Sequence, residues 1–332
     1  MAEGDPILGS LYIYAPNQVA PILFAIAFAC SAAGHIWQCC RYKAFRLVGL
    51  HPGCAVLLAV GYALREYGSF NYLFNRANLT VFICSQVFIY ICPPALELAN
   101  YHVLARIFYY VPHLSPLQPG HVMRTFGGLM AIVETLNSVG VSLFANPFAE
   151  MSRQRMGKDL VLAAVVIQLV IILIFFAMAS IFHIRCARAG FTDTNTALTT
   201  SLWALYTSMV LIFVRCIYRL VEKTAFKSVF IRDLEELKQL SPLLRYETFF
   251  YVFEATFMLV NSMIWNIWHP GRFLPRDRRV HLTEDGTLVT DEREPIKRSL
   301  IENVGSVMTF GVFFRGNEDS KRREWTEMTS SS

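Results

Sequence analysis

One uninterrupted apolar run constrains the fold of this chain more than any other feature of the sequence. The run DLVLAAVVIQLVIILIFFAMASIF, at 159–182, carries a single charged residue, Asp159, at its start. An α-helix rises about 1.5 Å per residue, so about 20 apolar residues cross the roughly 30 Å hydrocarbon core of a bilayer. We therefore expect this run to form a membrane-spanning helix, whose backbone groups satisfy one another.

Six further segments of similar length are apolar enough to suggest additional spans. The segment at 47–66 is the weakest, because His51 and Pro52 interrupt it. Composition agrees with a membrane protein, since 54% of the residues are hydrophobic and only 17% are charged, against about 25% charged in soluble domains. The expected fold is an all-α integral membrane protein with a bundle of seven transmembrane helices, six or eight being the alternatives. The expected spans are 17–38, 47–66, 79–103, 123–145, 159–183, 197–220 and 247–268.

The distribution of basic residues predicts the orientation. No Lys or Arg precedes the first span, whereas Arg41, Lys43 and Arg46 follow it directly. The positive-inside rule then places the N-terminus outside, and seven spans place the C-terminus in the cytoplasm. The basic loop at 223–246 disagrees with this orientation. The expected domains are an extracellular segment at 1–16, a transmembrane domain at 17–271 and a largely disordered cytoplasmic tail at 272–332.

Charged residues at the end of the sixth span and the start of the seventh predict a polar network. A charge near the middle of a membrane helix costs about 2.5 to 3.5 kcal/mol, so it usually finds a partner. Arg215, Arg219 and Glu222 are spaced i, i+4 and i+7, which places them on one helical face. Glu247 and Glu254 are also seven residues apart. We expect an Arg-Glu network joining the two helices near the outer surface; alternatively, the arginines extend to the membrane surface and Glu247 caps its helix.

Two further acids lie inside the expected spans, Glu97 in the third and Glu134 in the fourth. Like Glu254, they need a partner, a water-filled cavity or access to the membrane surface. Tyr251 and the neighbouring aromatic residues can line an apolar groove. Aromatic residues near span ends are, alternatively, ordinary interfacial anchors.

The sequence does not support catalysis. Ser31 and His35 have the Ser-x-x-x-His spacing of some membrane metal-dependent hydrolases, but the remaining histidines stand singly and no His-x-x-x-His pair occurs. A catalytic metal needs three strong ligands in one place. Neither a G-x-S-x-G elbow nor a Walker loop is present. We expect no enzyme activity, no catalytic residues, no metal and no cofactor.

Seven short motifs in order resemble those of fungal RTA-like proteins. The motifs are LYIYAP at 11–16, GYALR at 61–65, PAL at 94–96, YHVLAR at 101–106, RCIYRLVE at 215–222, YETFFYVFEA at 246–255 and WHPG at 268–271. That family comprises seven-helix lipid-translocating exporters related to aminocholesterol-resistance proteins, and the resemblance covers approximately 11–275. It implies a structural role for Pro16, Arg65, Pro94, Tyr101, Arg106, Gln168, His269, Pro270 and Gly271.

The chain departs from the family pattern at three positions. An acid typical of the second span falls on Leu58, an acid typical of the fourth falls on Met130, and a later glutamine falls on Asn137. Glu97 and Glu134 are acids at other positions, which suggests that intramembrane acids have moved to neighbouring helices with a similar cavity kept. Alternatively, two polar contacts are lost, and the chain then need not share the substrate of the family.

The resemblance implies export or flipping of amphipathic lipids. The implied substrate class is sphingoid bases, sterol-like amines and membrane-active drugs, with a contribution to drug or lipid stress resistance. For such cationic amphiphiles, Glu97, Glu134 and Glu254 can supply the acid that the headgroup needs. Expected partners are these lipids and a protein that binds the tail, but no nucleic acid. The expected location is the plasma membrane, with vacuolar or endosomal membranes as alternatives. A lipid sensor or receptor signalling through its tail and a scaffold that alters membrane order remain alternative functions.

Overall fold

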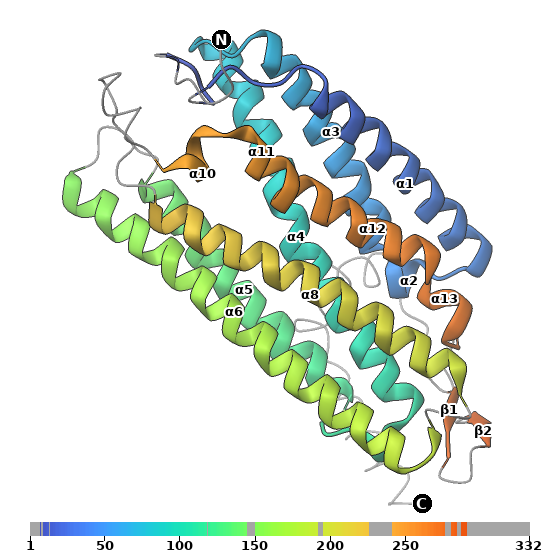
Figure 1. The fold of residues 1–332 in the computed structure, drawn as a ribbon. Coiled ribbons are helices and arrows are strands. Elements are labelled where there is room, and N and C mark those ends of the chain that lie inside the picture. Colours follow the sequence, from blue (N-terminus) through green and yellow to red (C-terminus); the bar gives the residue numbers. More distant parts are fainter. Residues whose placement is uncertain are drawn as a thin grey trace, which may run out of the picture.

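Long helices lying side by side make up the structure, a computed structural model (Figure 1). The residues that it describes are 7, 9–12, 14–117, 119–144, 150–191, 195–225, 241–275, 280–283 and 287–290. The long helices are α1 (Ala20–Tyr42), α3 (Leu50–Phe70), α4 (Arg76–Tyr110), α5 (Pro119–Phe144), α6 (Met151–Arg188) and α8 (Thr196–Ala225). A further helical stretch consists of α11 (Glu247–Phe250), the π-helical η2 (Tyr251–Thr256) and α12 (Phe257–Ile267). The short elements are α2 (Phe45–Val48), η1 (Pro112–Leu114), α10 (Pro242–Arg245), α13 (Pro270–Phe273), β1 (Val280–Leu282) and β2 (Leu288–Thr290).

Six helices in the described residues are long and apolar enough to cross a membrane. They are Ala20–Tyr42, Arg76–Tyr110, Pro119–Leu143, Ser152–Arg188, Thr196–Ala225 and Glu247–Phe273. The chain is therefore an all-α integral membrane protein. The expected second span corresponds to α3, which has 21 residues but is not among these six helices. His51, Arg65 and Glu66 lower its apolar character, although α3 packs against both α1 and α4.

The helices begin and end differently from the expected spans. The structure extends the expected 79–103 to Arg76–Tyr110, and 159–183 to Met151–Arg188. At about 1.5 Å per residue, α6 is about 57 Å long, which exceeds the thickness of a hydrocarbon core. Hydropathy marks only the part of a helix that meets hydrocarbon, whereas the polar ends continue the same hydrogen-bond pattern.

Both ends of the described chain pack against the bundle. The N-terminal segment bonds to the connection after α3, from the Leu11 amide to the Tyr72 carbonyl at 2.9 Å. After α13, the strands β1 and β2 form an antiparallel pair, and Leu282 is buried. This pair lies at the opposite end of the bundle from the N-terminus (Figure 1). The expected disordered tail therefore contains ordered residues near its start; 291–332 lie outside the described residues.

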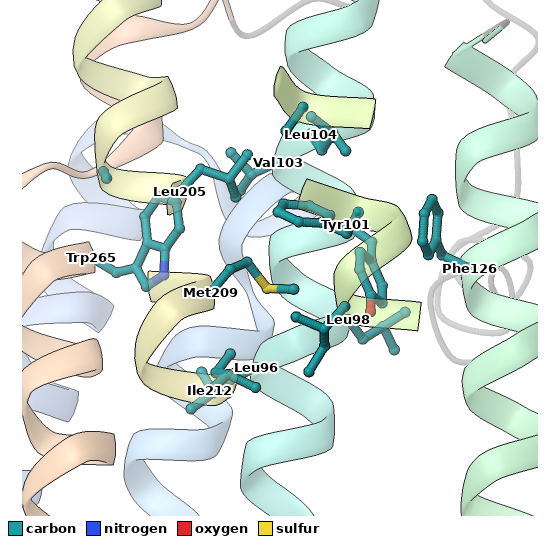
Figure 2. Close-up of a cluster of buried hydrophobic side chains, with 14 of the residues drawn as sticks. Leu96, Leu98, Tyr101, Val103, Leu104, Phe126, Leu205, Met209, Ile212 and Trp265 are labelled. Carbon is teal, nitrogen blue, oxygen red and sulfur yellow. The ribbon is translucent and has the colours of Figure 1, made fainter. Parts of the chain in front are cut away.

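The core surrounds α4, which contacts α3, α5 and α8. Figure 2 shows Leu205 and Met209 of α8 between Trp265 of α12 and the side chains of α4. Tyr101 of α4 faces Phe126 of α5, with the ring centroids 4.5 Å apart.

The outer surface of the bundle is apolar. Large hydrophobic side chains are exposed along each of the candidate spans, including Leu23 of α1, Ile91 of α4, Leu173 of α6, Val210 of α8 and Met263 of α12. A soluble domain rarely exposes apolar patches of this extent. Such a surface suits lipid, since acyl chains are the environment that these side chains prefer.

Gly140 of α5 allows the close approach of α5 and α6. A Cβ at this position would lie 2.8 Å from the Gly157 carbonyl oxygen and 2.9 Å from the Val161 amide nitrogen. Because backbone atoms cannot move aside cheaply, we expect Gly140→Ala to lower the free energy of unfolding by about 1 to 3 kcal/mol. Denaturation of purified protein by SDS, followed by circular dichroism, measures this change.

The matched control for this substitution is Gly128→Ala on the same helix. A Cβ there meets no atom within 4 Å. Both variants gain the same helix propensity, about 1 kcal/mol over glycine. Equal stability of the two variants would show that α5 and α6 are not in backbone contact at Gly140.

Candidate functional site

Glu254 lies at an irregular point in the last helical stretch. It belongs to η2, where the chain is π-helical between α11 and α12. Short π-helical segments are rare and often occur at functional sites. The Glu254 side chain is completely buried, so its charge requires partners within the bundle.

Two arginines of α8 bind the Glu254 carboxylate. Arg215 donates from Nε to Oε1 at 2.8 Å, and Arg219 donates from Nε to Oε2 at 3.0 Å. Arg219 also donates from Nη1 to Oε2 of Glu222 at 2.5 Å, and its guanidinium lies 3.8 Å from the centroid of the Tyr90 ring. The structure therefore brings together two positive and two negative side chains, and the network joins α8 to η2.

Glu247 does not join this network, contrary to the sequence-based expectation. Its Oε1 accepts from Arg65 of α3 at 2.7 Å, and its Oε2 accepts from the Asn17 amide at 2.6 Å. The expectation was wrong because it assumed a regular α-helix from Glu247 to Glu254. The π-helical turn between them has i→i+5 bonds, so residues seven apart no longer share a face.

Aromatic residues complete the surroundings of Arg65. Its guanidinium donates to the hydroxyls of Tyr14 and Tyr251, each at 3.3 Å, and lies 4.2 Å from the Phe250 ring centroid. Burial raises the pKa of Tyr14, which therefore accepts this bond as a neutral phenol. Arg65 thus joins the N-terminal segment, α3 and the start of the last helical stretch.

Glu97 of α4 is the third buried acid, and its partners are neutral. The Tyr101 hydroxyl donates to Oε1, and Gln168 of α6 donates from Nε2 to Oε2 at 2.6 Å. None of the ion pairs among the described residues includes Glu97. Glu97 is therefore held by neutral hydrogen-bond donors, whereas Glu254 and Glu247 are held by arginines.

Glu134 of α5 is half-buried and takes part in none of the ion pairs found in the described part of the chain. Met130, one turn earlier, is buried in the core, as is Leu58 of α3. Asn137 is half-buried. At the first two departures from the family pattern, apolar side chains thus fill the core where an acid was expected.

The remaining motif residues lie at helix ends and contacts between helices. His269 caps α13 by accepting the Gly271 amide on Nδ1 at 3.1 Å, and Pro270 begins that helix. Arg106 donates to the carbonyl of Pro275. Pro16 is buried before α1, and Pro94 lies inside α4.

A buried hydrogen-bond network was missed by sequence reasoning. The Ser208 hydroxyl of α8 accepts from the Asn100 side-chain amide of α4 at 2.8 Å and from the Trp265 indole of α12 at 3.0 Å, and it donates to Oδ1 of Asn261 of α12 at 2.6 Å. The available signal was the spacing of Asn261 and Trp265, four residues apart on one helical face. This network rigidifies the meeting point of three helices.

The Ser31 and His35 pair has a structural explanation. Both side chains contact the Ser262 hydroxyl, at 2.7 and 3.2 Å. In the described residues, no group of three or more His, Cys, Asp or Glu side chains is arranged to hold a metal ion.

The apolar exterior, the six candidate spans and the buried ion pairs define a multi-pass membrane protein whose helices are joined by internal charges. The chain belongs to the RTA1-like family, since the family model described as "RTA1 like protein" matches residues 53–277. The resemblance read from the motifs is thereby confirmed.

Three relatives are similar to this chain. It is 49% identical, over 97% of its length and 63% of the relative's, to "Lipid-translocating exporter-like protein RTA1" of Leptosphaeria maculans. It is 29% identical to a protein with the same name from Ajellomyces capsulatus, over 62% of this chain and 63% of the relative. It is 25% identical to "Probable lipid transporter atnI" of Emericella nidulans, over 80% of this chain and 69% of the relative.

The chain therefore spans less than two thirds of the length of the first two relatives. No solved structure matches it.

Proposed function

We propose that this chain translocates amphipathic lipids across the membrane in which it resides. The observation that carries the proposal is the 49% identity, along 97% of the chain, to a relative named as a lipid-translocating exporter-like protein. The name of the Emericella nidulans relative, a probable lipid transporter, supports the same activity. The chain covers only part of the length of each relative. The activity named for the relatives is therefore attributed to this chain only as a proposal.

The proposed substrates are cationic amphiphiles such as sphingoid bases, sterol-like amines and membrane-active drugs. A cationic headgroup needs an acid that no arginine already neutralises. Glu247 and Glu254 are held by Arg65 and by the α8 arginines, which disfavours them. Glu134, half-buried on α5, is our candidate for the ammonium group. Export of such compounds would contribute to resistance against drugs or lipid stress.

The proposed topology has seven spans with the N-terminus outside and the C-terminus in the cytoplasm. At 21 residues, α3 is about 31 Å long, enough to cross the hydrocarbon core. Its arginine, Arg65, is 2% exposed and paired with Glu247, so it presents little charge to lipid. The plasma membrane is the proposed location, and the proposal includes no enzymatic reaction.

Reorientation of a fluorescent sphingoid base in liposomes tests the proposed function. We expect liposomes with the purified protein to move the lipid faster than empty liposomes. Glu134→Gln removes a charge-assisted contact worth about 1.5 to 3 kcal/mol, so the rate should fall at least about tenfold. Glu150→Gln, at an exposed acid before α6, is the matched control and should leave the rate unchanged.

A neutral N-acylated analogue separates the headgroup contact from general damage. If Glu134→Gln slows both lipids equally, the assignment of the ammonium to Glu134 is wrong. If wild-type protein binds the base saturably without moving it, a sensor that signals through its tail replaces the transporter. Neither binding nor movement would favour a structural scaffold.

A further inference from the structure

The acids of the bundle interior differ in their countercharges. Glu247 has Arg65, and Glu254 has Arg215 and Arg219, at distances of 2.7 to 3.0 Å. Glu97 is as completely buried as Glu254, and the hydrogen-bond donors that reach it from the described residues are the Tyr101 hydroxyl and the Gln168 amide. An ionised Glu97 would therefore be a buried charge held by neutral groups alone.

The position of Glu97 makes ionisation of its carboxyl group unfavourable. It lies within the apolar part of α4, and its partner Gln168 lies near the middle of α6 (Met151–Arg188). Isolated ionised carboxylates are strongly disfavoured in such surroundings, where the group usually becomes neutral instead. The two arginine-bound acids avoid this cost because their charges are matched.

The hydrogen-bond partners of Glu97 can hold its carboxyl group with or without a proton. A phenol can donate or accept, whereas an amide NH₂ only donates. With a proton on Oε1, the carboxyl O–H donates to the Tyr101 oxygen while Gln168 still donates to Oε2. When the proton leaves, Tyr101 turns its own O–H toward Oε1. The same two partners therefore hold both forms without rearrangement of the helices.

The charged and titratable groups near Glu97 come from three helices. These are Tyr101 of α4, Glu134 of α5, and Arg215 and Cys216 of α8, while α6 supplies the non-titrating Gln168. Arg215 favours the ionised form and Glu134 opposes it. Because Arg215 is already bound to Glu254, its charge is largely matched before it acts on Glu97.

α4 lacks backbone hydrogen bonds one turn before Glu97. Pro93 and Pro94 stand inside the helix, and neither has a backbone N–H, so two i→i−4 bonds are missing there. Helices bend at such positions. Bending at this point would change the packing around Glu97, which lies one turn further along the helix.

We propose that Glu97 is a proton-binding site inside the bundle, protonated in the conformation described here and exchanging its proton with water when α4 bends. The use of this proton to drive or gate lipid movement rests on the proposed function; the binding of the proton does not. The step is a simple transfer, in which water takes the proton from the carboxyl group and returns it.

Infrared spectroscopy of the full chain in phosphatidylcholine liposomes at neutral pH tests the site directly. We expect a C=O stretching band of a protonated carboxyl group that shifts in D₂O and is lost in Glu97→Gln. Glu150→Gln, at an exposed acid, should leave the band unchanged. Gln168→Leu keeps the carboxyl but removes its donor, so the band should remain and move to higher frequency.

The second variant keeps the proposal testable should Glu97→Gln fail to fold. A band that neither disappears in Glu97→Gln nor shifts in Gln168→Leu overturns the proposal, as does the absence of any such band in the wild type. Lipid movement is measured separately in the same liposomes. A Glu97 band without lipid movement would support the proton site and contradict the transport function. Lipid movement without the band would support the transport function and contradict the proton site.

Discussion

Replacing Glu254 with alanine is expected to lower the free energy of unfolding by about 3 to 5 kcal/mol, the cost of breaking a buried ion pair on one side. The loss is large because Arg215 and Arg219 are only 5% and 7% exposed. Both would keep their charges without the carboxylate that binds them, and Glu222 can compensate only Arg219. SDS titration followed by circular dichroism, with size-exclusion profiles as a check on folding, measures the effect.

Val252→Ala is the matched control for the Glu254 variant. Val252 lies two residues away on the same π-helical segment and is 42% exposed, so its truncation leaves no buried charge. We expect its unfolding transition to stay within about 0.5 kcal/mol of wild type, as for most surface substitutions. Equal free energies of unfolding for Glu254→Ala and this control would contradict the network. Glu254→Gln, which keeps the shape but not the charge, should lie between the two.

The pairing of α8 with Glu254 was predictable from the sequence, because each step depended on local rules. Arg215 and Arg219 are one turn apart, so they share a face. A charged face in a membrane helix needs a partner, and the next helix begins at the level where the previous one ends. Hydropathy likewise located six of the helices, since each contains a stretch that is long and apolar enough to cross the hydrocarbon core.

The remaining contacts were not predictable because no local sequence pattern indicates them. Arg65 and Glu247 are 182 residues apart in the chain, and the π-helical turn that separates Glu247 from the α8 arginines has no sequence signal of its own. The family resemblance implies a structural role for Gln168 but not its partner, because that partner depends on how α4 and α6 face each other. The same reason hides the bond between Asn100 and Ser208.

A charge exchange distinguishes the pairing in the structure from the one expected from the sequence. Glu247→Arg alone should prevent most of the protein from folding, since it places a second positive charge against Arg65 and leaves the Asn17 amide without its acceptor. We expect Arg65→Glu, added to Glu247→Arg, to restore part of the folded protein. Arg219→Glu, added instead, should restore none. The yield of monodisperse protein from membranes, measured by size exclusion, gives the result.

The extent of rescue separates the electrostatic part of this contact from the rest. Exchanging the charges restores the ion pair but not the bonds from Arg65 to Tyr14 and Tyr251 or its contact with the Phe250 ring. The double variant should therefore fold while its N-terminal segment is cleaved faster by protease than in the wild type, because Tyr14 and Asn17 have lost their anchors. Equal rescue by Arg219→Glu would instead mean that Glu247 faces α8, and that Arg65 holds the N-terminal segment without it.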